Sequence, residues 1–358
     1  MVKVDESGIL LWGLIIGVIL ILATFVPIIL KGFAQVWYSL YSMESTVSEE
    51  VSFTPHERKE FPFNFSEFIG QTRTVENLKI SIHVAKKEVT PLPHTLFYGM
   101  PGLGKTTLAE LIAQEMAVPF ISIEGGSLDS KDGIVSVVNQ ITEGTIVFID
   151  EIHQISHRMS EVWYKIMENY TMDIVGDTVY NVDVPRFTTI GATTDFGKLL
   201  KPFRDRFVHL YELAPYTVQE LFSIIRLIGS VSEETAKATA EISQYTPRLA
   251  KNYVRAMTEY ASYSNRSEIT VDDFNKLIRL KNITKFGLTD AQMRVLHSLA
   301  KAGDKMGKNA LAMAASISMV DLEELVEPYL VIRGFIARTP RGREITAFGK
   351  AILSDIKI

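Results

Sequence analysis

A glycine-rich segment carries the strongest chemical signal in the sequence. Residues 99–107 read Gly-Met-Pro-Gly-Leu-Gly-Lys-Thr-Thr, and they lie between a short apolar run at 95–98 and a helical pattern that continues to residue 116. This is the spacing of a phosphate-binding loop in its strand–loop–helix context, where backbone N–H groups and the positive end of a helix surround phosphate oxygens. The Lys105 ammonium would reach the β- and γ-phosphates, and the Thr106 hydroxyl would bind Mg²⁺. The loop residues expected to contact nucleotide are Gly99, Gly102, Leu103, Gly104, Lys105, Thr106 and Thr107.

Two carboxylates end a second apolar run about 40 residues further along the chain. Residues 145–149 read as a buried parallel strand, and Asp150 and Glu151 follow at its carboxyl end. Asp150 would hold the Mg²⁺ shell, and Glu151 would polarise the attacking water, because phosphoryl transfer depends on positioning and charge neutralisation. Together with the loop, this pair predicts hydrolysis of the nucleotide as well as binding.

Further polar residues follow a third apolar run, at 187–192. The hydroxyls of Thr193 and Thr194 would point at the same edge of the sheet, where they could fix the γ-phosphate or the lytic water. Arg204 and Arg206 come shortly afterwards; they are either surface charges or an arginine finger that reaches the γ-phosphate of a neighbouring subunit. Their spacing alone does not choose between these alternatives.

Two histidines follow the carboxylate pair. His153 and His157 are four residues apart, a spacing that can serve a metal ion on a helix, but the sequence shows no third ligand. We do not expect them to bind metal.

The elements that must position these residues are apolar strand runs alternating with helical patterns. This order predicts an α/β fold with a parallel sheet. A length of 358 residues predicts two or three domains. The sequence has no Cys, which excludes disulfides, Cys-ligated metal centres and thiol nucleophiles, and the net charge of −5 excludes a strongly basic chain. Any contact with nucleic acid must therefore come from a local patch.

The N-terminus predicts a membrane anchor. Residues 9–30 form a stretch of 22 residues without a charge, long enough to cross a bilayer as a helix, and a polar linker leads on to residue 60. A cleaved signal peptide and a buried core helix are the alternatives. Since the nucleotide site needs cytosolic nucleotide, we expect the N-terminal tail outside and the ATPase body on the cytoplasmic side.

Taken in order, the motifs resemble the AAA+ ATPases, and specifically the RuvB branch-migration motors. The similarity is collinear over about residues 61–354. The matching segments are Phe68-Ile69-Gly70-Gln71, Gly99 to Thr107, Phe148 to His153, Gly191 to Thr194, Leu200 to Phe207, Thr246-Pro247-Arg248, Glu327 to Leu330 and Arg338 to Arg343.

This resemblance implies roles for further residues. Ile69 and Gly70 would line the adenine pocket, which Tyr216 would help to close. Thr194 would be the sensor of the γ-phosphate, and Arg248 would sense nucleotide within its own subunit. A finger drawn from Arg204 and Arg206 requires a ring, which the family suggests is a hexamer around duplex DNA.

The resemblance also implies the domain order. Residues 61–215 would form the AAA+ core, 216–285 a helical lid and 286–358 a winged helix, after an anchor and linker at 1–60. The last domain is the only basic one, with 10 Lys and Arg against 8 Asp and Glu. Its Arg338, Arg341 and Arg343 would contact DNA phosphates in the wing, unless the wing is a solvated basic hairpin or binds protein.

Three departures from the family pattern qualify these expectations. Phe61-Pro62 stands where the family has Arg-Pro, so one nucleotide contact is in doubt. A predicted hairpin at 173–183 is several residues shorter, and because it is the family's docking surface for its partner RuvA, that partnership is in doubt. The membrane span is foreign to the usual cytosolic motor.

The sequence therefore predicts a membrane-tethered, ATP-dependent and Mg²⁺-dependent motor of RuvB type that acts on duplex DNA or four-way junctions. The rival hypothesis is a membrane-anchored AAA+ ATPase that remodels protein, which the span and the shortened hairpin favour. A nucleotide-dependent scaffold with little turnover is a third alternative, against which Asp150, Glu151 and the two arginines argue.

Overall fold

The computed structural model describes residues 64–175 and 179–356. The predicted span at 9–30, the linker and Phe61-Pro62 lie outside these ranges. Within the ranges, no helix combines the length and the hydrophobicity needed to cross a membrane.

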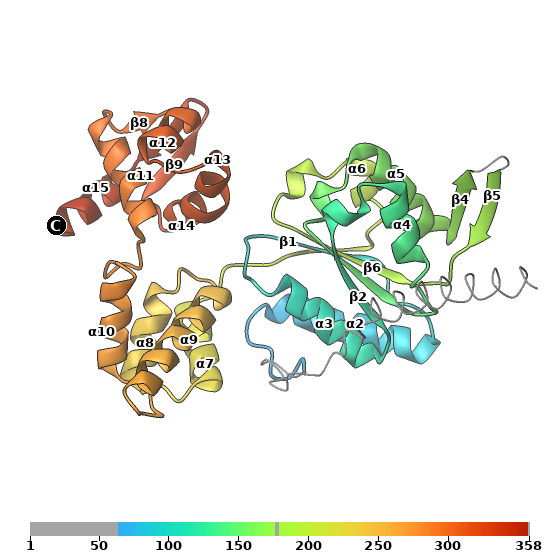
Figure 1. Ribbon diagram of the computed structural model, residues 1–358, viewed down its shortest axis with the longest axis horizontal. Helices are drawn as coiled ribbons and strands as arrows, with labels where there is room; N and C mark the ends of the chain where they lie inside the picture. The colour runs from blue at the N-terminus through green and yellow to red at the C-terminus, as the bar shows by residue number, and fades with distance from the viewer. Residues whose placement is uncertain (1–63, 176–178, 357–358) are drawn as a thin grey trace, which may run out of the picture. The chain divides into compact units, whose positions relative to one another are not determined.

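A five-stranded sheet forms the centre of the ATPase core (Figure 1). Every neighbouring pair of strands is parallel, so the carboxyl ends of all five strands lie at one edge. The predicted parallel α/β core is confirmed. The strands, in spatial order, are β2 (Phe120–Glu124), β3 (Ile146–Asp150), β6 (Thr188–Thr193), β1 (Thr95–Tyr98) and β7 (His209–Glu212).

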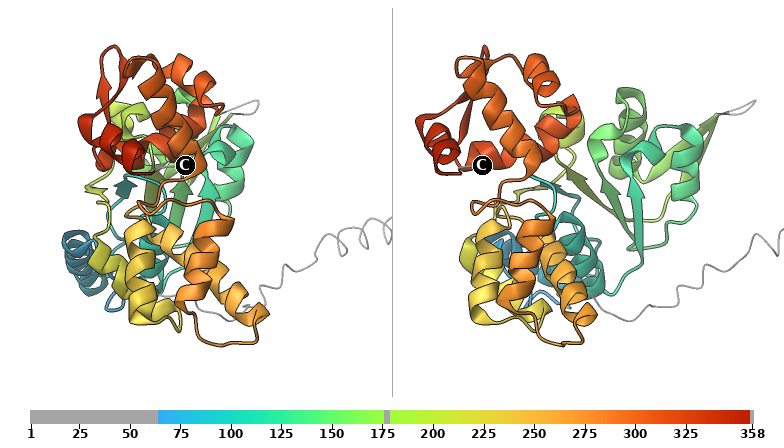
Figure 2. Two further views of the ribbon diagram at one scale, coloured as in Figure 1. Left: turned by 90° about the vertical axis from the view of Figure 1, so that its left-hand side faces the viewer. Right: turned by 60° about the vertical axis from the view of Figure 1, so that its left-hand side comes forward.

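Helices cover both faces of this sheet (Figures 1 and 2). Phe148 packs in the cluster that contains α2 and α3, whereas its neighbour Val147 packs in the cluster that contains α4 and α5. Alternate strand residues thus serve opposite faces, and because both faces are buried, the strands read as continuous apolar runs. The helices are α2 (Thr72–Glu88), α3 (Lys105–Met116), α4 (Lys131–Val138), α5 (His157–Asn169) and the short α6 (Lys201–Arg204).

Short turns and a hairpin complete the core. The 3₁₀ turns η1 (Gly125–Leu128), η2 (Ile152–Gln154) and η3 (Phe196–Lys198) follow β2, β3 and β6 at the carboxyl edge. The predicted hairpin is present as the antiparallel strands β4 (Thr171–Val175) and β5 (Val179–Asp183), which form a separate two-stranded sheet.

Four helices make the lid that follows the core. Thr217 and Glu220 form a capping box at the start of α7, and Pro247 occupies the first turn of α9, where its missing N–H costs no helical hydrogen bond. The helices are α7 (Val218–Ile228), α8 (Glu233–Ile242), α9 (Pro247–Tyr263) and α10 (Val271–Leu280).

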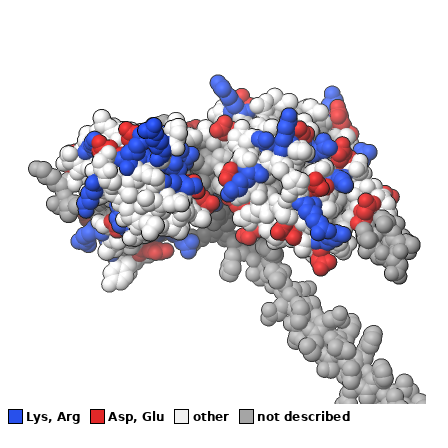
Figure 3. Space-filling model, turned by 90° about the horizontal axis from the view of Figure 1, so that it is seen from above, with Lys and Arg blue, Asp and Glu red and all other residues white. Residues whose placement is uncertain are grey.

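The C-terminal part is a winged helix, as predicted. A three-stranded antiparallel sheet in the order β8–β10–β9 packs with helices around its own apolar core. The space-filling view shows Lys and Arg side chains gathered on one surface of this domain (Figure 3, left). Its elements are α11 (Asp290–Lys301), β8 (Lys305–Met306), α12 (Lys308–Ala314), α13 (Met319–Asp321), a π-turn η4 (Leu322–Val326), α14 (Glu327–Ile332), β9 (Ile336–Thr339), β10 (Gly342–Ile345) and α15 (Ala347–Asp355).

His94, just before β1, joins two other elements of the core. Its Nε2 donates to the carbonyl of Met167 in α5 at 3.1 Å, and its Nδ1 accepts the N–H of Thr189 in β6 at 2.8 Å. One nitrogen must donate and the other must accept, so the ring is held neutral. Burial lowers the pKa of His94 below its ordinary value of 6.5.

The His94 ring makes stability depend on pH. Because the folded state excludes a proton that the unfolded chain takes up, the free energy of unfolding should fall as the pH drops below about 6.5. Denaturant titrations at pH 7.5 and 5.5 measure this effect. His94→Gln should weaken the pH dependence, and His83→Gln, at an exposed position on α2, should not. Equal pH dependence in His94→Gln and the wild type would contradict the assignment.

Candidate active site

The predicted phosphate loop joins β1 to α3 at the carboxyl edge of the sheet. Gly99 and Gly102 have φ values of 133° and 81°, in the region that favours glycine. A Cβ at Gly99 would lie 2.7 Å from the carbonyl oxygen of Leu213, so the loop backbone passes closer to its neighbour than a side chain allows. Thr106 lies in the first turn of α3, half-buried.

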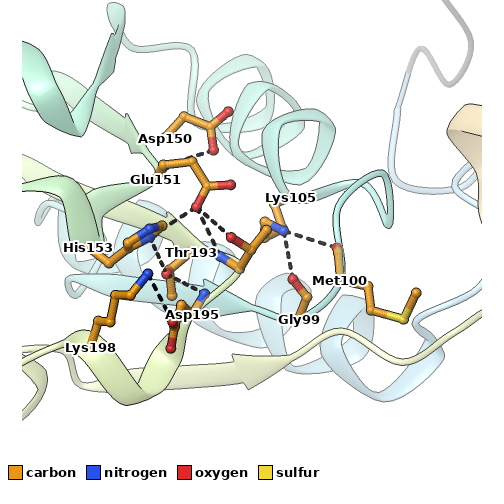
Figure 4. Close-up of polar contacts among 10 residues, drawn as sticks. Gly99, Met100, Lys105, Asp150, Glu151, His153, Thr193, Asp195 and Lys198 are labelled. Atoms are coloured by element: carbon orange, nitrogen blue, oxygen red, sulfur yellow. Dashed lines mark hydrogen bonds and ion pairs between the residues drawn. The ribbon is translucent and has the colours of Figure 1, made fainter. Parts of the chain in front are cut away.

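Lys105 points back over this loop (Figure 4). Its Nζ donates to the carbonyls of Gly99, at 2.9 Å, and Met100, at 3.1 Å, and the residue is only 7% exposed. Burial lowers the pKa of the Lys105 ammonium, while the nearby carboxylates of Glu151 and Asp150 oppose that change. Among the residues described, the ammonium is therefore close to two negative charges yet hydrogen-bonded only to neutral carbonyls, so it is free to bind a phosphate.

The two carboxylates lie where β3 ends. Asp150 accepts the N–H of Glu151 at 3.0 Å, and burial raises the pKa of Asp150 against the effects of that hydrogen bond and of Lys105. Glu151 has a φ of 44°, which is strained for a side chain of this type. A Cβ at Gly125 would meet the Glu151 carbonyl oxygen at 2.5 Å, so η1 closely supports this turn.

Strand register brings the predicted hydroxyls to the same place. Gly191 in β6 is the partner of Ile149 in β3, so the residues after both strands meet. Thr194 donates to Glu151 Oε2 through its N–H at 3.1 Å and its Oγ1 at 2.9 Å. Thr193 is instead fully buried, and its Oγ1 lies 3.0 Å from His153 Nδ1.

The residues expected around adenine also lie together. Gly70 has a φ of 84°, and a Cβ there would come within 2.5 Å of the Tyr216 ring. Tyr216 is 4% exposed, its hydroxyl lies 3.4 Å from the Leu103 carbonyl, and burial raises its pKa. Ile69 is half-buried next to Gly70. These contacts join the segment before α2 to the loop and to the start of the lid.

Arg248, the lid residue, touches the loop directly. Its N–H donates to the carbonyl of Gly102 at 3.4 Å, and a Cβ at Gly102 would lie 2.9 Å from Arg248 Cβ and 2.7 Å from Thr246 Cγ2. Its charge acts on both Lys105 and Asp150. The structure thus places Arg248 beside the other candidate nucleotide residues.

The two candidate finger arginines lie apart from this group. The Arg204 guanidinium lies over the Phe196 ring, 4.9 Å from its centre, and Arg206 pairs with Glu168 at 3.0 Å and lies over Tyr164. Within residues 64–175 and 179–356, neither has a hydrogen bond or ion pair with the loop or with the carboxylates.

The histidines occupy different environments. His157 is exposed at the start of α5, 3.6 Å from Glu161, while His153 faces the carboxylate site. The described ranges contain no group of three side chains suited to hold a metal ion. Mg²⁺ commonly takes one or two protein oxygens together with nucleotide phosphates and water, and the Asp150 carboxylate and Thr106 hydroxyl fit that pattern.

The wing arginines have partners that sequence reasoning missed. Glu327 is fully buried in the first turn of α14, paired with Arg338 Nε on one oxygen and with Arg343 Nε at 2.9 Å on the other. Arg343 is 13% exposed, and Glu323, four residues before Glu327, lies 3.9 Å from it. Arg341 is exposed at the turn of the wing, without a hydrogen bond or ion pair to the described part of the chain.

A parallel sheet with a phosphate loop, an acidic pair at the next strand end and a helical lid defines an ATPase of the AAA+ class. Two family models match this chain: "Holliday junction DNA helicase RuvB P-loop domain" over residues 61–213 and "RuvB C-terminal winged helix domain" over residues 285–354. The chain belongs to the RuvB family, which confirms the resemblance drawn from the motifs.

Relatives agree over most of the chain. The "Holliday junction branch migration complex subunit RuvB" of Ehrlichia ruminantium is 36% identical over 304 residues, covering 82% of this chain and 92% of its own. That of Campylobacter fetus is 36% identical over 307 residues, covering 82% and 89%. Among solved structures, the Thermotoga maritima RuvB Holliday junction branch migration motor has a TM-score of 0.74 and 32% identity, covering 82% of this chain and 97% of its own. A mutant of that protein has a TM-score of 0.76.

Proposed function

We propose that this RuvB-family ATPase works as a ring of identical subunits that uses ATP and Mg²⁺ to drive branch migration of four-way DNA junctions. The main observation in its support is that Lys105, Glu151 and Thr194 lie at one edge of the sheet. Arg248 of the lid contacts the phosphate loop beside them, and the chain carries a RuvB-type winged helix. Asp150 and Thr106 would hold Mg²⁺, which supplies charge neutralisation at the phosphates.

The same proposal assigns the remaining nucleotide contacts and the domains. Gly99, Gly102, Leu103, Gly104 and Thr107 would surround the phosphates, while Ile69, Gly70 and Tyr216 would hold adenine. The core would end near residue 215 and the lid near 285. The span at 9–30 would anchor the ring with its body in the cytoplasm. The β4–β5 hairpin corresponds to the segment on which the family docks its partner RuvA, and because the sequence shortens it, the proposal includes no RuvA-type partner.

One experiment tests the function. We would measure the ATPase rate of the full-length chain, purified with detergent present, without DNA, with linear duplex and with a synthetic four-way junction. We expect DNA to stimulate turnover, most strongly with the junction. Turnover that neither DNA changes would contradict the DNA motor and favour the rival protein-remodelling ATPase.

A site shared between subunits makes a second prediction. Within the described residues, Arg204 and Arg206 have no hydrogen bond or ion pair with Asp150 or Glu151 of the same subunit, so we propose that one of them completes the site of a neighbour. Of the Arg204→Ala and Arg206→Ala chains, the one that lacks the finger should lose its ATPase activity. Mixing that chain with a Lys105→Ala chain should restore part of the activity. That partner supplies an intact arginine while the finger-deficient chain supplies an intact loop. No recovery with either variant would contradict the shared site.

In the wing, the structure divides the three arginines. We propose that Arg341 contacts DNA phosphates, and that Arg338 and Arg343 mainly neutralise Glu327. Arg343→Ala should lower the free energy of unfolding by about 1–3 kcal/mol, because it removes one of the two cations beside a buried carboxylate and leaves Arg338 as its remaining partner. Arg341→Ala should leave stability unchanged, weaken duplex binding and reduce the salt slope of log K by about 1.

Denaturant unfolding and DNA titrations over a series of salt concentrations measure both effects. The two variants are each other's control, since both remove one arginine from the same wing. A stability loss in Arg341→Ala equal to that in Arg343→Ala would contradict this division.

A further inference from the structure

His153 lies at the nucleotide site, and the proposed function gives it no role. It follows Glu151 by two residues, in the turn η2, and its side chain is 11% exposed. Its Nδ1 lies 3.1 Å from Glu151 Oε2 and 3.0 Å from Thr193 Oγ1 (Figure 4). The sequence offered no role for this residue beyond metal binding, which we did not expect, and its observed neighbours are a carboxylate and a hydroxyl.

These distances favour a proton on Nδ1. Were Nδ1 unprotonated, its lone pair would face the lone pairs of Glu151 Oε2 at 3.1 Å, which is repulsive. A proton on Nδ1 can instead be shared between Glu151 and Thr193. The Thr193 hydroxyl oxygen also accepts the N–H of Asp195 at 3.0 Å, so it is itself fixed in place. His153 Nδ1 is thus hydrogen-bonded to Thr193 and makes a second close polar contact with the Glu151 carboxylate.

The two oxygens of Glu151 are used unequally. Oε2 accepts the N–H and the hydroxyl of Thr194 and faces His153, whereas Oε1 has no hydrogen bond or ion pair within the described residues. Donors on one oxygen fix the rotation of the carboxylate about its last bond. They leave Oε1 as the oxygen that can accept a proton from water.

Thr194 has one hydroxyl proton and two uses for it. As the sensor of the γ-phosphate that the family resemblance implies, that hydroxyl would bind the nucleotide, and it would then no longer donate to Glu151. The contacts that remain on Oε2 are the hydrogen bond from the Thr194 N–H and the close approach of His153 Nδ1. We infer that His153 is a positioning residue, which keeps Glu151 aligned for water activation when the Thr194 hydroxyl turns to the nucleotide. This inference rests on the proposed function.

Three substitutions at one position test the inference. Asn places a donor nitrogen where Nδ1 stands, Gln places its donor further out near Nε2, and Leu has no donor. We expect His153→Leu and His153→Gln to lower kcat for ATP hydrolysis about 10- to 100-fold, since a misplaced catalytic group costs about this much. His153→Asn should retain most of the wild-type kcat. The dissociation constant of a fluorescent ATP analogue should be unchanged in all three variants.

His157→Leu is the matched control, because it removes an exposed histidine side chain four residues away, which lies 3.6 Å from Glu161. Its kcat should equal that of the wild type. Wild-type kcat in His153→Leu would overturn the inference, and so would an equal loss of kcat and melting temperature in the Asn, Gln and Leu variants, which would indicate a structural role.

Glu151→Gln, assayed in the same series, tests the role of Glu151 separately from that of His153. An inactive Glu151→Gln beside a fully active His153→Leu would overturn the role of His153 and leave the proposed function standing. Normal hydrolysis by Glu151→Gln would overturn the proposed role of Glu151, and the inference about His153 with it.

Discussion

Glu151→Gln is expected to keep the affinity for ATP and to lower the rate of hydrolysis by about 100- to 10,000-fold, the range that a positioned general base contributes. The amide retains an oxygen that can accept the N–H and hydroxyl of Thr194, so the local geometry survives. It has no negative charge with which to polarise water. The phosphate contacts of Lys105 and the loop are untouched, which is why binding should persist.

Single-turnover hydrolysis and equilibrium binding of a fluorescent ATP analogue measure these two quantities separately. Glu161→Gln is the matched control, since Glu161 lies on the exposed face of α5 and faces His157. The Glu151→Gln protein should also accumulate as an ATP-loaded ring, which mass photometry would detect. Hydrolysis at the wild-type rate would show that another group positions the water.

Lys105→Ala is expected to abolish nucleotide binding, with a loss of affinity of about 100-fold or more. Charge-assisted hydrogen bonds each contribute about 1.5–3 kcal/mol, and this ammonium is the only cation of the loop, where it would serve two phosphates. Burial of the ammonium between Glu151, Asp150 and two loop carbonyls increases its effect, because water cannot replace it there. Isothermal titration with ATP and Mg²⁺ measures the change.

Lys86→Ala controls for the loss of a lysine. Lys86 lies in the last turn of α2 and makes an exposed ion pair with Glu115, so its removal should leave nucleotide affinity unchanged. Circular dichroism would establish that both variants fold. Near-normal ATP affinity in a folded Lys105→Ala protein would contradict the assignment of the phosphate site.

Much of the nucleotide site could be predicted because its signals are local. The glycines, Lys105 and Thr106 lie within one loop, and the parallel strands bring Glu151 and Thr194 to a common edge by a general rule of such sheets. His153 could not be understood in this way. Its meaning depends on Thr193, 40 residues away, whose hydroxyl turned to the interior while that of Thr194 faced the carboxylate.

The wing shows a different kind of failure. A cluster of arginines predicts a positive surface. The carboxylate that pairs with two of them, Glu327, lies in another element, 11 residues before Arg338. The sequence does not show that Glu327 is buried against the β9–β10 hairpin. Arg338 and Arg343 were therefore assigned to DNA, although both pair with this carboxylate. The helix around Glu327 is also irregular, with a π-turn before Pro328, whose missing N–H interrupts the regular pattern of hydrogen bonds.

The close fit at Gly102 bears on how the lid can move. A Cβ at this glycine would lie 2.7 Å from Thr246 Cγ2 and 2.9 Å from Arg248 Cβ, at the start of α9, so no side chain fits between the loop and the lid. The phosphate loop and the start of α9 are therefore in direct contact at this point, through the Arg248 N–H and the Gly102 carbonyl as well as through packing. A displacement of the loop backbone at Gly102 would be transmitted to the lid at once, because no side chain lies between them.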